Sequence, residues 1–185
     1  RQRQMCIRDR DRMSRLIGDM LSLANADNKS WSIMKTDCEL DTLLLDTYEK
    51  YQPILHGKKI SLKVVLPEEP LSICKCDSAR ISQVLGILLD NGASYVPAGG
   101  RMEMGVKENE KYFQLYVQDN GPGIPDENKE AVFRRFYRAD PARKEKQHFG
   151  LGLCIAREIV TLHKGSIRIL DTPGGGSTFV IRLPK

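Results

Sequence analysis

The fold is decided by Val117-Gln118-Asp119-Asn120-Gly121-Pro122-Gly123-Ile124-Pro125, where an apolar strand pattern runs directly into an acid, two glycines and two prolines. Glycine adopts dihedrals that other residues avoid and carries no side chain, so the backbone at Gly121 and Gly123 can approach a ligand closely. The pattern therefore predicts a pocket floor with the carboxylate of Asp119 at the edge of a sheet. The alternative for this stretch alone is a surface turn, because Asn-Gly and Pro-Gly pairs are common turn sequences.

Four other stretches flank this one in a fixed order. They are Gln83-Val84-Leu85-Gly86-Ile87-Leu88-Leu89-Asp90-Asn91-Gly92-Ala93-Ser94-Tyr95-Val96-Pro97, Val132-Phe133-Arg134-Arg135-Phe136-Tyr137-Arg138-Ala139-Asp140, Gly150-Leu151-Gly152-Leu153-Cys154-Ile155-Ala156 and Gly174-Gly175-Gly176-Ser177-Thr178-Phe179. Together the five stretches resemble the N, G1, F, G2 and terminal Gly-Thr boxes of the ATP-binding domain of sensor histidine kinases. The resemblance covers about residues 36–185. One box alone is weak, but the ordered set with matching spacing is specific.

The composition is that of an ordinary globular protein. With 185 residues, 41% hydrophobic and 29% charged, the chain is long enough for one full domain plus an appendage. It contains no apolar run near the length of a membrane span, and we expect no signal peptide. Lys and Arg outnumber Asp and Glu by 29 to 24, but residues 1–10 alone carry four Arg against one Asp. The small remaining excess does not support nucleic-acid binding.

The chain has five scattered cysteines: Cys6, Cys38, Cys74, Cys76 and Cys154. Cys74 and Cys76 lie two apart in a strand-like run, so both thiols are expected on one face. No further Cys or His pair follows at zinc spacing, which favours free thiols over a metal site. Reduced cysteines fit a cytoplasmic location.

The N-terminal part is predicted to lie outside the ATP-binding domain. Residues 1–10 (RQRQMCIRDR) lack periodicity and resemble translated cloning or adapter sequence, so we interpret them as a non-native leader. Apolar residues then recur at spacings of three and four up to about residue 26, which predicts an amphipathic helix that needs a partner. The resemblance implies that residues 11–30 are the second helix of the dimerisation and phosphotransfer hairpin plus a linker. The alternative is a terminal helix folded back on the domain.

Residues 31–185 are predicted to form the catalytic domain. Strands are expected at 31–35, 59–66, 71–76, 101–107, 112–118, 166–170 and 178–183, and helices after Asp37 and Asp77 and over 151–163. The first helix is expected to be capped by Asp37 and to bury Leu40, Leu43, Leu44, Thr47, Tyr51 and Ile54. The fold class is α+β: a two-layer α/β sandwich whose mixed sheet is covered on one face by about three helices, preceded by one amphipathic N-terminal helix.

Three residues carry the expected recognition of ATP and Mg²⁺. An ionised Asp119 only accepts hydrogen bonds, which suits the exocyclic amine of adenine, whereas guanine has an acceptor there. Asn91 and Tyr95 are four apart and so share one helix face. The resemblance implies that Asn91 holds Mg²⁺ through its amide oxygen, a ligand type that suits this ion, and that Tyr95 packs on adenine. The alternative for Asn91 is a polar residue near a helix C-terminus.

The other boxes supply the remaining candidate residues. The resemblance implies that Phe133 anchors a lid over residues 139–149 and that Arg138 contacts the terminal phosphate. The alternative for this basic aromatic stretch is a charged helix face. Glycines that open a helix let its backbone N–H groups approach phosphate. The full expected ATP site is Asn91, Tyr95, Asp119, Gly121, Gly123, Ile124, Phe133, Arg138, Gly150, Leu151, Gly152, Leu153 and Thr178.

The chain departs from the family pattern in three places. Ile87 and Ser94 replace a second Asn and a basic residue, and Gln147-His148-Phe149 replaces a glycine pair, so we expect weakened ATP binding. None of the three histidines, His56, His148 and His163, has the setting of a phosphoacceptor.

The resemblance therefore implies a protein histidine kinase fragment that lacks its phosphoacceptor. It would use ATP and Mg²⁺ to phosphorylate a histidine-bearing hairpin of the parent kinase, for relay to a response regulator receiver domain. The parent is expected to be homodimeric and membrane-anchored, with this part in the cytoplasm. One alternative is a docking module without catalysis. Another is a gyrase, chaperone or mismatch-repair ATPase, which is disfavoured because those enzymes use a Glu where Ile87 stands.

Overall fold

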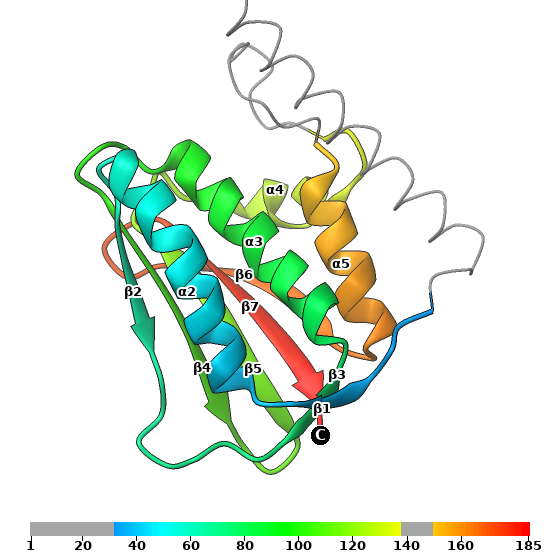
Figure 1. The fold of residues 1–185 in the computed structure, drawn as a ribbon. Helices are drawn as coiled ribbons and strands as arrows, with labels where there is room; N and C mark the ends of the chain where they lie inside the picture. Colours follow the sequence, from blue (N-terminus) through cyan, green and yellow to red (C-terminus); the bar gives the residue numbers. More distant parts are fainter. Residues whose placement is uncertain (1–31, 138–149) are drawn as a thin grey trace, which may run out of the picture.

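The computed structural model describes residues 32–137 and 150–185, which form a mixed sheet with helices on one face (Figure 1). The expectations for the leader, the amphipathic N-terminal helix and its linker therefore lie outside the described residues. The same holds for Arg138 and for the expected lid at residues 139–149.

The main sheet has five strands in the order β2-β4-β5-β7-β6. The strands are β2 (Ser61–Val65), β4 (Arg101–Glu108), β5 (Tyr112–Asp119), β7 (Ser177–Pro184) and β6 (Ser166–Asp171). Only the β2–β4 pair is parallel, and the other three pairs are antiparallel. A separate antiparallel ribbon joins β1 (Thr36–Cys38) to β3 (Cys74–Cys76). The prediction of a mixed sheet is confirmed.

Three long helices cover one face of this sheet (Figure 1). They are α2 (Leu40–Gly57), α3 (Ser78–Tyr95) and α5 (Gly152–Leu162), with α3 between the other two. The short helix α4 (Asp126–Lys129) and the 3₁₀ turn η1 (Ala131–Phe133) follow β5. The described residues place no helix over the opposite face of the sheet. The two-layer sandwich expected from the sequence is thus confirmed.

The core lies between α3 and the central strands. The predicted stripe of α3 is fully buried and consists of Ile81, Val84, Leu85, Leu88 and Leu89. Residues of β5 alternate between the two faces of the sheet, because successive side chains of a strand point to opposite sides. The covered-face positions are Phe113, Leu115, Val117 and Asp119. A carboxylate therefore takes the last place in a row of apolar side chains.

The first part of the domain differs from the prediction. The strand expected at 31–35 is wrong: the first described strand is β1, which contains Asp37, and Glu39 takes the N-cap position of α2. The helix buries Leu55, whereas Ile54 is 47% exposed. Leu55 continues the four-residue spacing from Tyr51 and so stays on the buried side. The partner of β1 is β3, which lies far along the chain, and a strand of three residues depends on that partner.

Asp77 joins three parts of the fold. Its Oδ1 accepts a hydrogen bond from Arg80 N at 3.1 Å, which confirms the predicted N-cap of α3, and its Oδ2 accepts one from Met34 N at 3.0 Å. Its own N–H donates to Nε2 of His163 at 3.0 Å. Nδ1 of His163 therefore carries the proton and donates to Ile159 O at 2.8 Å. His163 is a buried structural residue, as expected.

We predict that Asp77→Ala destabilises the domain by about 1–2 kcal/mol, because α3 loses its cap and Met34 loses its acceptor. Urea unfolding followed by circular dichroism would measure this difference. Asp77→Asn keeps an oxygen acceptor and should recover most of the loss. Asp37→Ala, which removes an exposed acid of the same ribbon, is the control and should change stability by less than about 0.5 kcal/mol. Equal effects of Asp77→Ala and Asp37→Ala would contradict the role given to Asp77.

Candidate functional site

Asp119 is held in place at the end of β5. Its side chain is buried, with 8% of the residue exposed. Oδ1 accepts hydrogen bonds from the backbone N–H groups of Gly121 at 2.8 Å and Ser177 at 3.4 Å. A Cβ placed on Gly92 of α3 would lie 3.9 Å from the Cβ of Asp119, so the carboxylate is on the helix side of the sheet. This setting differs from that of a solvated acid in a surface turn.

The environment of Asp119 is unfavourable for a charge without a partner. Burial raises the pKa of the carboxyl group, and the two backbone N–H donors lower it by a smaller amount. Within residues 32–137 and 150–185, no cation forms an ion pair with Asp119, and Oδ2 accepts no hydrogen bond. A hydrogen-bond donor brought by a ligand would therefore find a preformed acceptor.

The C-terminal end of α3 lies directly over Asp119. Gly92 packs on Met102, which pairs with Asp119 across β4 and β5, and a Cβ on Gly92 would require the end of the flexible Met102 side chain to move. Asn91 is half-buried beside it, and Tyr95 is partly exposed one turn later. A Cβ on Gly121 would lie 3.6 Å from Val96. The predicted Asn91, Tyr95, Asp119 and Gly121 are thus brought to one end of the helix layer.

Two glycine turns pack against each other beside the carboxylate. Gly176 has φ of +106°, and a Cβ there would collide with the backbone oxygen of Asp119. A side chain at this position would be both strained and obstructed, so the turn requires glycine. A Cβ on Gly123 would lie 3.3 Å from Gly176 O. The G1 stretch and the terminal glycine stretch therefore form one wall of the site.

The G2 stretch leads into α5 and lies against α3. The N–H of Phe136 donates to Gly150 O at 2.9 Å, so the described residues on either side of the range 138–149 lie side by side. Leu151 is fully buried, while Leu153 and Ile124 pack at the edge of the core. Gly152 begins α5, and a Cβ there would lie 3.2 Å from Cγ2 of Ile87. Ile87 is one turn before Asn91, so the N-terminus of α5 faces this part of α3.

The aromatic residues of the F stretch have two different settings. Phe133 is buried, and the guanidinium carbon of Arg157 lies 5.5 Å from the centre of its ring. Phe136 is 61% exposed and has φ of +60°, which is unusual for a residue with a side chain. Phe133 therefore anchors this segment to α5, whereas Phe136 presents its ring to the surface.

Thr178 is not placed beside Asp119. Its hydroxyl lies 2.9 Å from the hydroxyl of Thr172 and 3.5 Å from Oε1 of Gln118, whose side chain is on the open face of the sheet. The neighbour Ser177 is buried and donates to Asp119 instead. Residues two apart in a strand share a face, so Ser177 lies on the same covered face as the buried Phe179. The sequence prediction named Thr178 and missed Ser177.

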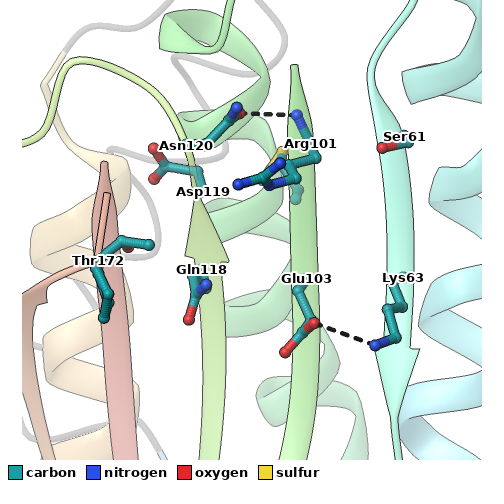
Figure 2. A pocket seen from close by; sticks show the side chains of 10 residues that line it. Ser61, Lys63, Arg101, Glu103, Gln118, Asp119, Asn120 and Thr172 are labelled. Carbon is teal, nitrogen blue, oxygen red and sulfur yellow. Dashed lines mark hydrogen bonds and ion pairs between the residues drawn. The ribbon is translucent and has the colours of Figure 1, made fainter. Parts of the chain in front are cut away.

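A polar hollow lies on the open face, where Figure 2 shows side chains from β2, β4 and β5. Lys63 and Glu103 form an ion pair across it at 3.6 Å. Asn120 accepts a hydrogen bond from Arg101 N at 2.8 Å and so ties the end of β5 to the start of β4. Ser61, Arg101 and Asp119 also line the hollow, which indicates no particular ligand. It also lies on the side of the sheet opposite to Asn91.

Comparisons with known proteins place the chain in a family. The model of the histidine kinase-, DNA gyrase B-, and HSP90-like ATPases matches residues 76–185. The chain belongs to this ATPase family. It is 35% identical over 175 residues to sensor protein SrrB of Staphylococcus aureus, an alignment covering 94% of this chain and 30% of that protein. The chain thus spans less than a third of the length of the curated relatives that it matches.

Solved structures support the same assignment. The catalytic domain of histidine kinase ThkA is 26% identical and superposes with a TM-score of 0.72, covering 82% of this chain and 96% of that one. Full-length ShkA in complex with AMPPNP is 22% identical with a TM-score of 0.83, covering 94% of this chain and 36% of that one, and shows a shared fold. The resemblance found in the sequence is confirmed: this is an ATP-binding catalytic domain of the sensor histidine kinase type.

Two further observations concern metals and membranes. Among the described residues, no group of three or more His, Cys, Asp or Glu could hold a metal ion. The described part of the chain also contains no helix that is long and apolar enough to cross a membrane.

We predict a pH signature for Asp119. Because its pKa is raised, the folded protein binds this proton more tightly than the unfolded chain does. The contribution of Asp119 to the free energy of unfolding therefore falls as the pH rises from the ordinary range of an aspartate through the raised pKa. Asp119→Asn should remove this fall and be at least as stable as the wild type at neutral pH.

Urea unfolding between about pH 4 and pH 8 would measure this effect. Asp46→Asn, which changes an exposed acid on α2, is the matched control and should leave the pH profile unchanged. A clear loss of stability at neutral pH in Asp119→Asn would show that the charge supports the fold, contrary to our interpretation.

Proposed function

We propose that this domain binds ATP with Mg²⁺ and transfers the γ-phosphoryl group to a histidine on a hairpin of the parent kinase, for relay to the receiver domain of a response regulator. One observation carries the proposal. A buried carboxylate beneath the end of α3 has one oxygen fixed by backbone N–H groups, and no residue in the described part of the chain binds the other. Membership of the ATPase family supports the same conclusion.

Adenine recognition would rest on Asp119. The exocyclic amine of adenine donates a hydrogen bond, and Oδ2 of Asp119 is an acceptor on the helix side of the sheet. Guanine has a carbonyl oxygen at that position. This oxygen and the ionised carboxylate both only accept hydrogen bonds, so no hydrogen bond would form between them. We keep Tyr95 as a candidate contact of the adenine ring, and we propose Ser177 in place of Thr178 as the residue of the last box that positions Asp119.

Magnesium would be held by Asn91 and by the phosphates. A neutral amide oxygen is a suitable ligand for Mg²⁺, which usually keeps several waters and takes few protein ligands. Ile87 contributes an apolar contact to Gly152 where the family has a second Asn, so this chain would supply one amide ligand there. When bound, the ion neutralises charge on the phosphates.

The phosphates would lie at the N-terminus of α5. Backbone N–H groups at a helix start attract anions, and the N-terminus of α5 faces the Asn91 end of α3. Phosphoryl transfer depends mainly on positioning and on charge stabilisation, so these groups need no covalent role. Arg138 stays a proposed contact of the terminal phosphate outside the described residues. In the transfer, the bond from the γ-phosphorus to the β,γ-bridging oxygen breaks as a new P–N bond forms, and ADP leaves.

The acceptor histidine would come from another part of the parent kinase. Nε2 of His163 accepts the Asp77 N–H and Nδ1 donates to Ile159, so neither nitrogen of this ring is available as a nucleophile. His56 lies at the exposed end of α2. We therefore keep the histidine-bearing hairpin as the acceptor, in a parent that is homodimeric, anchored in the membrane and exposes this domain to the cytoplasm.

Two solved relatives support the choice of ligand and partner. ShkA was crystallised with AMPPNP, an ATP analogue. ThkA was also crystallised in complex with response regulator protein TrrA. The ThkA chain of that complex is 24% identical to this chain and superposes on it with a TM-score of 0.76. We extend both properties to the parent of this chain as part of the proposal.

Calorimetry with an ATP analogue and Mg²⁺ tests nucleotide recognition. Asp119→Asn should weaken binding by about 10-fold or more, because a hydrogen bond to a charged group contributes roughly 1.5–3 kcal/mol. Asp46→Asn is again the control and should bind as the wild type does. The pH experiment above checks that Asp119→Asn stays folded. An affinity within about twofold of the wild type would rule out the assigned role of this carboxylate.

A transfer assay separates the kinase from a docking module without catalysis. The chain would be incubated with radiolabelled ATP, Mg²⁺ and a separate histidine-bearing hairpin from a related kinase. Label on the hairpin histidine, lost in Asn91→Ala, would support the kinase. ATP binding without transfer to any of several hairpins would favour the docking module. That alternative is considered because Asn91 supplies only one amide ligand where the family has two.

A further inference from the structure

Three cysteines meet in the ribbon formed by β1 and β3. Cys38 is 8% exposed, and Cys74 and Cys76 are each 1% exposed. Cys38 lies directly opposite Cys74 in the antiparallel register. Opposite residues of such a pair have Cα atoms about 4.5–5.5 Å apart, which lies within the range of about 4.4–6.8 Å found in disulfides. We call Cys38, Cys74 and Cys76 the thiol cluster.

The three thiols lie on one face of the ribbon, because Cys74 and Cys76 are two apart on β3 and Cys38 lies opposite Cys74. Donation from Cys76, with a smaller contribution from Lys35, lowers the pKa of Cys74 against the effect of burial. Burial raises the pKa of Cys38. Cys74 is therefore the first of the three to become a thiolate, which is the reactive form of cysteine.

Metal binding does not explain this cluster. Among the described residues no set of three potential ligands has the geometry to hold a metal ion. His163, which lies beside Asp77 at the end of β3, uses both ring nitrogens in hydrogen bonds to the backbone. The cluster thus combines a reactive thiol, a thiol opposite to it at disulfide distance and a third thiol that donates a hydrogen bond.

We propose that the thiol cluster is a redox modification site, in which Cys38 and Cys74 form a reversible disulfide that joins β1 to β3. The oxidant is a hydroperoxide. The Cys74 thiolate attacks one peroxide oxygen, so that an S–O bond forms, the O–O bond breaks and the leaving oxygen takes a proton as water or an alcohol. The sulfur of Cys38 then attacks that of Cys74, forming the S–S bond and releasing water. Two thiols lose two electrons in total, and one peroxide is reduced.

Access to the buried sulfurs follows from the size of the ribbon. β1 and β3 pair through only three residues each, and Thr36 and Asp37 on β1 are exposed. Short pairings of this kind open locally at a lower free energy than the whole domain needs to unfold. Transient separation of β1 would therefore expose Cys74 to a small oxidant while α3 and the main sheet remain folded.

The disulfide would act on the segment that leads into the domain. In the reduced protein this segment is held by the three-residue pairing of β1 with β3 and by the bond from Met34 N to Asp77. Asp77 directly follows Cys76 and caps α3, whose other end carries Asn91. Oxidation would add a covalent bond between this segment and β3, which directly precedes α3. This inference goes beyond the proposed function, because it concerns the cysteines and does not depend on ATP.

Peptide mapping after oxidation tests the proposal. The purified chain would be treated with hydrogen peroxide, and the remaining thiols would be alkylated under denaturing conditions. We expect loss of two of the five thiols, a Cys38–Cys74 linked peptide and recovery of all thiols with dithiothreitol. Cys154, which is buried in α5, is the internal control and should stay reduced. Cys154→Ser should therefore form the same linkage.

Two variants define the roles of the other thiols. Cys38→Ser should abolish the linked peptide. Cys76→Ala should give the same product several-fold more slowly, because Cys74 loses its hydrogen-bond donor. The wild-type map alone would overturn the proposal if all five thiols persisted, if Cys38 were linked to Cys76, or if the only disulfide joined two chains through Cys6. Because these outcomes need no variant, they are readable even if a substitution prevents folding.

Discussion

The placement of one carboxylate in an apolar row constrains this structure more than any other feature. Asp119 occupies the position after Val117 on the covered face of β5, where a further aliphatic side chain would otherwise complete the core. The fold tolerates this charge because two backbone N–H groups reach the same oxygen, one from the turn that follows and one from β7. Both donors depend on glycine turns that pack on each other. The strand, its two glycine turns and the end of α3 therefore form a single unit, and the proposed recognition of adenine rests on that unit.

Helix α3 connects this unit to the beginning of the domain. Its first residue follows Asp77, which holds the segment that leads into the domain, and its last turns carry Asn91 and lie over Asp119. The stripe between them is fully buried, so the helix is packed along its length as a rigid element. A displacement of one end of α3 would therefore also move the other end. The thiol cluster and the proposed nucleotide site lie near opposite ends of this helix, and the cysteine chemistry of the ribbon can be studied separately from nucleotide binding.

Most of the fold followed from local sequence patterns. The stripe of α3, the cap at Asp77 and the paired strands β4 and β5 were predictable, because periodicity and capping act within a few residues. The start of the domain was not, since β1 is a strand only through its pairing with β3, and that contact leaves no signal near Asp37. In the site, the ordered boxes located Asn91, Asp119 and the glycines. The choice between Ser177 and Thr178 required the pairing register with β5, which determines which of two adjacent hydroxyl residues faces the helices.

The hydrogen bond from Phe136 to Gly150 has a consequence for how this domain can diversify. Because the two residues are joined directly, the described chain before residue 138 and after residue 149 is held together by a backbone hydrogen bond. The entropy of closing a loop rises only slowly with its length, by about 0.6 kcal/mol for each doubling. A change in the number of residues between Phe136 and Gly150 would therefore cost little folding free energy as long as this hydrogen bond is kept.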